Sequence, residues 1–198
     1  MQKETYEWVH SWCDQTQKND LPRVLLIGDS ITFGYQEEVR KLLEGVCYVD
    51  YFTTSYAIDD KIYTLLLDNF IKDSNYALLH FNHGLHGMHM SVNTYRSKIE
   101  KFLAKVAKGK KVILAETTAV NKPGNRRRDT VWMKKVIARN EVINMLSEKL
   151  GYPVDRLYDV SAELPVSARA EDGTHYQKAG NEALAACVAE SIKAELGR

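Results

Sequence analysis

The chain has 198 residues, with 27 Lys or Arg and 26 Asp or Glu, so its formal net charge at pH 7 is +1. This balance removes the whole-chain electrostatic argument for nucleic-acid binding, and nucleic acid is not expected as a partner. Hydrophobic residues make up 44% and charged residues 27% of the sequence, as in ordinary globular proteins. No apolar run of about 18 residues occurs, so no membrane association is expected. Residues 1–198 are therefore expected to fold as one domain.

The three cysteines, Cys13, Cys47 and Cys187, are widely spaced and odd in number. This pattern argues against a disulfide framework or a thiolate zinc site, and it favours free thiols in a reducing compartment. The first residues lack the continuous apolar core of a secretory signal. A cytoplasmic location is therefore expected, or a secreted one if a leader once preceded Met1. Apolar and aromatic residues at helical spacing predict a short N-terminal helix, within residues 1–20, that packs on the domain.

Short runs rich in branched and aromatic residues predict five strands. These runs are residues 23–27, 46–52, 76–81, 111–116 and 155–160. A helix is expected to begin at or just after Ser30, and apolar residues at helical spacing predict further helices. These lie between Ser91 and Gly109, between Asp129 and Gly151, and over residues 184–196.

Strands that alternate with helices imply a parallel sheet with right-handed crossovers. Near-continuous apolar strands are buried on both faces, so helices must cover both sides. The sequence therefore predicts an α/β protein, a three-layer α/β/α sandwich around a mostly parallel, five-stranded sheet. Sites in such folds form beyond the carboxyl ends of the strands. Three polar peptides lie at these ends: residues 28–30, 82–84 and 171–175.

Ser30 follows the first predicted strand through Gly28 and Asp29, at the expected start of a helix. The turn exposes the hydroxyl at the sheet edge, and the helix start favours a nearby anion. A serine hydroxyl is a poor nucleophile until a base takes its proton. Asp172 and His175 precede the last helix, where the carboxylate can accept the Nδ1–H and leave Nε2 facing outward. A tight turn, an anion-binding helix start and a capping loop are the structural alternatives.

Two segments carry a resemblance to a known family: Gly-Asp-Ser-Ile-Thr at residues 28–32 and Asp-Gly-Thr-His-Tyr at residues 172–176. With the order of strands and helices between them, the chain resembles the SGNH/GDSL hydrolases over most of its length. The resemblance implies a flavodoxin-like sandwich, hydrolysis of esters or thioesters, and no metal or organic cofactor. It implies Ser30 as nucleophile, His175 as general base and then acid, and Asp172 as the carboxylate that orients the imidazole.

The resemblance also implies an oxyanion hole with three donors. The first is the N–H of Ser30. The second is the side chain of Asn82, because residues 81–87 are similar to the family's block after the third strand; another register of this block would give the role to His86. The third is a glycine N–H in the loop after the second strand. That loop contains no glycine here, and Ser55 is the expected substitute.

Asp29, His83 and His86 are expected to contact the substrate, because a pocket at this edge collects convergent polar groups. The two histidines belong to a series with a histidine at every third position, which also contains His80 and His89. Such a series suggests a metal, but residues three apart on a strand point to opposite faces, and no carboxylate or thiolate lies nearby in the sequence. Pocket lining or loop packing is therefore expected, and no metal site.

A basic loop follows the fourth predicted strand. It contains Lys122, Arg126, Arg127 and Arg128. A solvated loop is the default interpretation. Since the carboxyl end of this strand lies near the expected site, the loop could instead form a lip over the substrate and favour acidic substrates.

The sequence thus predicts a serine esterase with a small-molecule ester as its partner. Family analogy suggests a small acyl group, such as the acetyl group of an acetylated carbohydrate. A lysophospholipase or acyl-thioesterase of the same fold is one alternative. A non-catalytic module that holds an anion or a sugar at residues 28–30 is another. It is favoured by the missing glycine in the loop after the second predicted strand and by the altered block around Asn82. Nothing in the sequence indicates the oligomeric state.

Overall fold

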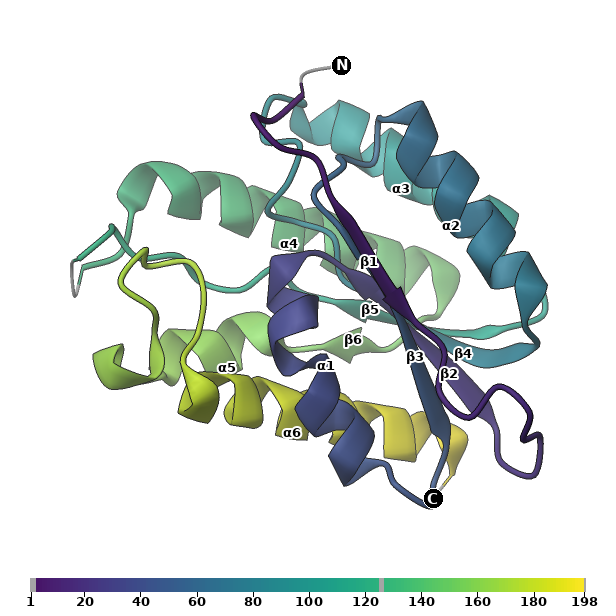
Figure 1. The fold of residues 1–198 in the computed structure, drawn as a ribbon. Coiled ribbons are helices and arrows are strands. Elements are labelled where there is room, and N and C mark those ends of the chain that lie inside the picture. The colour runs from purple at the N-terminus through teal and green to yellow at the C-terminus, as the bar shows by residue number, and fades with distance from the viewer. Residues whose placement is uncertain (1–2, 125–126, 198) are drawn as a thin grey trace.

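The computed structural model describes residues 3–124 and 127–197. Within these residues, six strands form one sheet in the order β1-β3-β2-β4-β5-β6 (Figure 1). The strands are β1 (Val9–Trp12), β2 (Arg23–Gly28), β3 (Tyr48–Thr54), β4 (Tyr76–Phe81), β5 (Lys111–Ala115) and β6 (Val154–Asp155). β1 pairs with β3 in the antiparallel sense, and the other neighbouring pairs are parallel. The predicted mostly parallel sheet is confirmed, with one strand more than expected.

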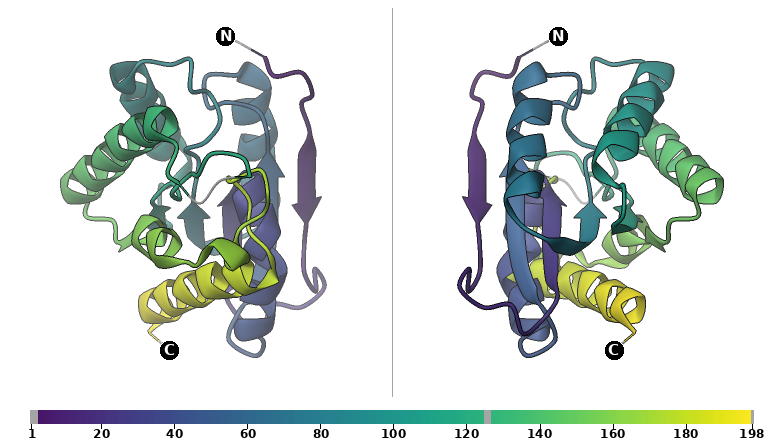
Figure 2. Two further views of the ribbon diagram at one scale, coloured as in Figure 1. Left: turned by 90° about the vertical axis from the view of Figure 1, so that its left-hand side faces the viewer. Right: turned by 90° about the vertical axis from the view of Figure 1, so that its right-hand side faces the viewer.

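Helices lie on both faces of the sheet (Figure 2). They are α1 (Ser30–Leu42), α2 (Lys61–Asp73), α3 (Val92–Val106), α4 (Thr130–Leu150), α5 (Leu157–Glu163) and α6 (Lys178–Leu196). α1 and α6 contribute buried residues to one hydrophobic core and α2 and α3 to the other, whereas α4 contributes to both. The predicted three-layer α/β/α sandwich is therefore confirmed. Over the described ranges, no helix has the length and apolar character needed to cross a bilayer.

Side-chain caps explain where the helices begin. Asp29, Asp60, Ser91 and Asp129 precede α1, α2, α3 and α4, and each side chain accepts a hydrogen bond from an N–H of the first turn. At the other end of α4, Gly151 has a φ of 71°, a left-handed conformation that glycine adopts without a steric cost. The helix boundaries predicted at Ser91, Asp129 and Gly151 are confirmed.

The N-terminal helix predicted within residues 1–20 is wrong, because this segment contributes β1. The pairing runs from Val9 opposite Thr54 to Trp12 opposite Tyr51, and Figure 2 shows β1 along the outer edge of the sheet. The aromatic residues of this segment recur at every second position, a spacing that also fits a strand. The segment forms a strand and not a helix because the edge of β3, which is remote in sequence, offers backbone groups for it to pair with.

The prediction of a strand over residues 155–160 is largely wrong. Only Val154 and Asp155 form β6, and α5 begins two residues later. In α5 the buried residues are Leu157 and Ser161, which are four positions apart and therefore share one helical face. β3 also begins two residues later than predicted, and α2 was not predicted at all.

Candidate active site

Ser30 lies where β2 passes directly into α1. Asp29 caps the helix through Oδ1, which accepts the N–H of Ile31 at 2.9 Å. Gly28 makes the turn possible, because a Cβ at this position would lie 2.0 Å from Oγ1 of Thr32. Ser30 is the first residue of α1, so its N–H is at the positive end of the helix dipole. The local fold therefore presents both the hydroxyl and the N–H of Ser30 at the carboxyl edge of the sheet.

A loop before α6 brings a carboxylate and an imidazole to the same edge. Oδ1 of Asp172 accepts the N–H of Thr174 at 2.8 Å and that of His175 at 2.9 Å, which fixes the turn. Oδ2 of Asp172 lies 2.6 Å from Nδ1 of His175, and Nε2 of His175 lies 2.7 Å from Oγ of Ser30. The predicted line of hydroxyl, imidazole and carboxylate is thus present, although 145 positions separate the serine from the histidine.

The hydrogen bonds around Asp172 fix its charge. Its partial burial acts to raise the pKa of the carboxyl group, but the hydrogen bonds from His175 and from two backbone N–H groups outweigh this effect and lower the pKa. Asp172 is therefore a carboxylate at neutral pH. A carboxylate can only accept hydrogen bonds, so Nδ1 of His175 carries the proton and Nε2 is left to accept the hydroxyl proton of Ser30.

The loop after β5 holds the Asp172 loop in place. Asn121 donates its N–H to the carbonyl of Gly173 at 2.9 Å, and Gly124 donates its N–H to the carbonyl of Glu171 at 2.6 Å. The approach is so close that a Cβ on Gly173, whose φ is 78°, would lie 2.3 Å from the carbonyl oxygen of Asn121. The position of Asp172 therefore depends on the loop that follows β5.

The predicted basic loop lies beside this contact. Arg128 donates to Oδ1 of Asn121 at 2.6 Å and also to the carbonyl of Ala162. Its guanidinium is therefore held by the protein, in contrast to the solvated residue or substrate lip expected from the sequence. Arg126 lies outside the described residues.

Two of the expected oxyanion donors already serve other acceptors. The N–H of Ser55 donates to the carbonyl of Trp8 at 3.3 Å, in continuation of the β1–β3 pairing. The prediction for Ser55 is therefore wrong, because the N-terminal strand that takes this N–H was not foreseen. Nδ2 of the buried Asn82 donates to the carbonyl of Glu116 at 3.0 Å. One of its two amide protons is used there, and its role at the site stays a prediction.

Two of the three expected substrate contacts are buried. Asp29 is 0% exposed and serves as the cap of α1, and His83 is 1% exposed. Nε2 of His83 lies 2.9 Å from the carbonyl of Tyr56, and its ring packs against Tyr63 with the ring centroids 4.9 Å apart. The prediction of substrate contact is wrong for Asp29 and His83, because packing behind the strand ends encloses both. His86 stays near the surface, with Nδ1 2.6 Å from Oε1 of Glu4.

Burial also decides the protonation of His83. Removal from water disfavours the imidazolium and lowers the pKa of His83 to about 4, against smaller opposing effects of the Tyr56 carbonyl and of Asp29. His83 is therefore neutral at physiological pH. A carbonyl oxygen can only accept, so Nε2 of this neutral ring carries its proton.

The four histidines of the series do not converge on one point. Nε2 of His80 lies 2.9 Å from Oδ2 of the buried Asp155, and Nε2 of His89 lies 3.0 Å from Oδ2 of Asp59. His83 and His86 bind the partners given above. In the part of the chain that the structure describes, no group of three or more His, Cys, Asp or Glu side chains could hold a metal ion.

Sequence reasoning missed two polar side chains of α4 that hold the strand ends. Arg139 is 3% exposed and donates to the carbonyls of Gly84, His86 and Gly87. The neighbouring Asn140 binds both backbone groups of Thr117, at 2.8 and 2.9 Å. The sequence does carry a signal for them, since both lie midway between the apolar positions 136 and 143 on the inner side of a predicted helix.

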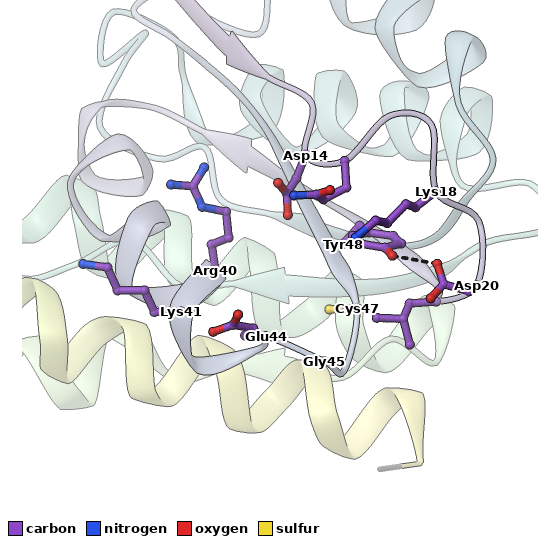
Figure 3. Close-up of a pocket in the computed structure, with 11 residues that line it drawn as sticks. Asp14, Lys18, Asp20, Arg40, Lys41, Glu44, Gly45, Cys47 and Tyr48 are labelled. Atoms are coloured by element: carbon purple, nitrogen blue, oxygen red, sulfur yellow. Dashed lines mark hydrogen bonds between the residues drawn. The ribbon is translucent and has the colours of Figure 1, made fainter.

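A cavity of about 530 Å³ lies at the opposite edge of the sheet (Figure 3). It is bounded by the last turn of α1 and by the loop before β2, and Tyr48 at the start of β3 donates to Oδ1 of Asp20 beside it. Acidic and basic side chains are mixed in its wall. Tyr48 is the first residue of β3, so the cavity lies at the edge of the sheet where the parallel strands begin. Ser30 follows the last residue of β2 and lies at the opposite edge, where these strands end.

No protein-family model matches the sequence, and no curated protein sequence matches it. Solved structures do share its fold, and they include GDSL-like lipases, acylhydrolases and an acetylxylan esterase. The chain therefore has the SGNH/GDSL hydrolase fold that the two motifs suggested.

Three similar structures illustrate the likeness. A lipase/acylhydrolase from Enterococcus faecalis is 19% identical with a TM-score of 0.69, over 88% of this chain and 96% of that one. A GDSL-like lipase from Bacteroides thetaiotaomicron is 18% identical with a TM-score of 0.68, over 87% and 88%. An acetylxylan esterase from Geobacillus stearothermophilus is 15% identical with a TM-score of 0.68, over 89% and 94%. For this esterase, variants with a serine or a histidine replaced by alanine are described as catalytic mutants.

Proposed function

We propose that this protein is a serine hydrolase that cleaves carboxylic esters through an acyl-enzyme. One observation carries the proposal: Oγ of Ser30, the imidazole of His175 and the carboxylate of Asp172 form one hydrogen-bonded line with distances of 2.7 and 2.6 Å. A hydroxyl in this arrangement can lose its proton to Nε2 as it attacks. An anion-binding turn would need only the N–H groups at the start of α1 and would not need the oriented imidazole.

The reaction begins with the attack of Oγ on the ester carbonyl carbon. The new O–C bond forms while the hydroxyl proton moves to Nε2 of His175, and the carbonyl π electrons move onto oxygen. The tetrahedral intermediate collapses when the bond to the leaving alkoxide breaks and Nε2 returns the proton to that oxygen. A water molecule then gives a proton to Nε2 and attacks the carbonyl carbon of acyl-Ser30. When this second intermediate collapses, the bond between that carbon and Oγ breaks, Nε2 returns the proton to Oγ, and the carboxylic acid leaves. These steps need no metal or organic cofactor.

The residues around the line have supporting roles. Asp172 holds the imidazole in the tautomer that accepts at Nε2, and its negative charge stabilises the imidazolium that forms during attack. The N–H of Ser30, at the positive start of α1, is the proposed donor to the carbonyl oxygen as negative charge develops on it. Asn82 remains a candidate second donor to that oxygen.

We further propose a small acyl group, with an acetylated carbohydrate as the substrate class. The support is the fold shared with an acetylxylan esterase; the fold shared with lipases and acylhydrolases supports the alternative of a longer acyl chain. A panel of p-nitrophenyl acetate, butyrate and octanoate, with an acetylated and a palmitoylated sugar, separates the two. We expect kcat/KM for p-nitrophenyl acetate to exceed that for p-nitrophenyl octanoate at least tenfold, after the rate measured with the Ser30→Ala variant is subtracted. Preference for octanoate would support a lipase or lysophospholipase instead.

A further inference from the structure

The segment of residues 84–87 crosses the carboxyl edge of the sheet above β4 and β2. At its start, a Cβ on Gly84 would overlap the side chain of Thr117, which follows β5. At its end, a Cβ on Gly87 would lie 2.8 Å from the Cβ of Ala57, which follows β3. In the strand order, β2 and β4 lie between β3 and β5. The segment therefore passes over the end of β2, where Ser30 begins α1.

The carbonyl groups of this segment are turned toward the helices on one face of the sheet. Nη1 of Arg139 donates to the carbonyls of Gly84 and His86, both at 2.8 Å, and Nη2 donates to that of Gly87 at 2.6 Å. The guanidinium lies over the ring of Tyr95, 4.4 Å from its centroid. Tyr95 belongs to the core beneath α2 and α3, on the face opposite α1. One buried side chain thus fixes the orientation of three peptide groups of this segment, those that begin at Gly84, His86 and Gly87.

The N–H groups of the same peptides must point the other way. The peptide bonds are trans, so each N–H is antiparallel to the carbonyl of the preceding residue. The N–H of Leu85 is therefore opposite the Gly84 carbonyl, and the N–H of Gly87 is opposite that of His86. Both point away from Arg139, toward the layer of α1 and α6, where the side chain of Leu85 is packed.

These two N–H groups are also without an acceptor. Leu85 and Gly87 are both buried, yet neither donates a backbone hydrogen bond to any group in residues 3–124 or 127–197. Buried N–H groups are satisfied in more than about 90% of cases, so this segment is unusual. The N–H groups of the buried His83 and Gly84 also have no acceptor among the described residues, and what distinguishes Leu85 and Gly87 is the direction that Arg139 gives to their peptide groups. A buried donor held in a fixed direction is what stabilisation of a transient negative charge requires.

We propose that the N–H groups of Leu85 and Gly87 are oxyanion donors alongside the N–H of Ser30, and that Arg139 is the residue that positions them. The inference rests on the proposed ester hydrolysis and deepens it at the same site. It also accounts for the loop after β3, which has no glycine and in which the N–H of Ser55 donates to the carbonyl of Trp8. The donors missing from that loop are supplied by the loop after β4.

Replacement of one amide by an ester removes a single N–H and keeps the side chain. The variant Leu85→leucic acid is expected to lower kcat for p-nitrophenyl acetate by about 10²-fold, with KM changed less than about threefold, because an oxyanion donor acts in the transition state. Leu21→leucic acid is the matched control at the amino edge of β2 and should keep the wild-type kcat. Methylboronic acid, whose serine adduct carries the oxyanion, should lose affinity by the same factor as kcat.

Arg139→Lys provides a second measurement, because an ammonium group keeps the charge but cannot serve three carbonyls in the guanidinium geometry. We expect kcat to fall at least tenfold with KM nearly constant, while Arg96→Lys on the exposed face of α3 keeps both values. Wild-type kcat in Leu85→leucic acid, or a loss confined to KM, would overturn the inference. If the wild-type protein shows no Ser30-dependent ester turnover, the proposed function itself is wrong, so the two failures are distinguishable.

Discussion

His175→Ala is expected to lower kcat for p-nitrophenyl acetate by about 10⁴-fold or more, because removal of one member of a serine–histidine–carboxylate unit costs roughly 10⁴ to 10⁶ in kcat. Nε2 of His175 is the only partner of Oγ of Ser30 among the described hydrogen bonds, at 2.7 Å. Without it, the hydroxyl would have to lose its proton to water. KM should change little, since the imidazole acts on the reacting proton.

The control for this variant is His89→Ala, which removes another histidine from the same edge of the sheet. His89 bonds to Asp59, and no hydrogen bond among the described residues joins it to Ser30, so its replacement should leave kcat within about twofold. Both variants should have thermal midpoints close to that of the wild type, because both imidazoles are partly exposed. Retention of most of the activity by His175→Ala would show that another group serves as the base.

Asp172→Asn is expected to lower kcat by about 10⁴-fold, because the amide no longer selects the tautomer of His175 that accepts at Nε2. The carboxylate is the partner of Nδ1 at 2.6 Å, and its other oxygen accepts two backbone N–H groups. Asparagine keeps the size and one acceptor oxygen, so the turn can persist while the charge is lost. The loss should be seen in kcat across the whole pH range in which the protein stays folded.

Glu171→Gln is the matched control, since it neutralises the adjacent exposed carboxylate. Among the described residues, the imidazole of His175 bonds to Asp172 and Ser30 and makes no hydrogen bond or ion pair with Glu171. It should keep kcat within about twofold. Equal losses in Asp172→Asn and Glu171→Gln would mean that the general negative charge of the loop matters and that the specific bond to His175 does not.

Much of this site was predictable because it depends on local rules. Glycine and aspartate before Ser30 predict a strand-to-helix turn, and the structure shows why each is needed: a Cβ at residue 28 would clash with Thr32, and Asp29 caps α1. The spacing of Asp172 and His175 allows the same local contact between their side chains. The topology of a parallel sheet then brings the two ends of the chain to one edge.

The parts that were missed depend on contacts between residues remote in sequence. β1 exists because β3 offers an open edge, and the same pairing takes the N–H of Ser55. His83 is buried by Tyr63 from a helix that was not predicted. The role of Arg139 depends on which way three carbonyls face, and no pattern of residue types encodes that direction. Local sequence spacing was therefore enough to predict Ser30, His175 and Asp172 as the candidate triad. The residues packed around the triad could be identified only from the structure.

Ester hydrolysis at this site requires Ser30 to be an activated nucleophile. Reaction with a fluorophosphonate, followed by mass spectrometry of the intact protein and of its peptides, tests it most directly. We expect one adduct per chain, located on Ser30, absent from Ser30→Ala and formed far more slowly in His175→Ala. A folded wild-type protein that gains no adduct at Ser30, or a Ser30→Ala variant that is labelled as fast as the wild type, would contradict it.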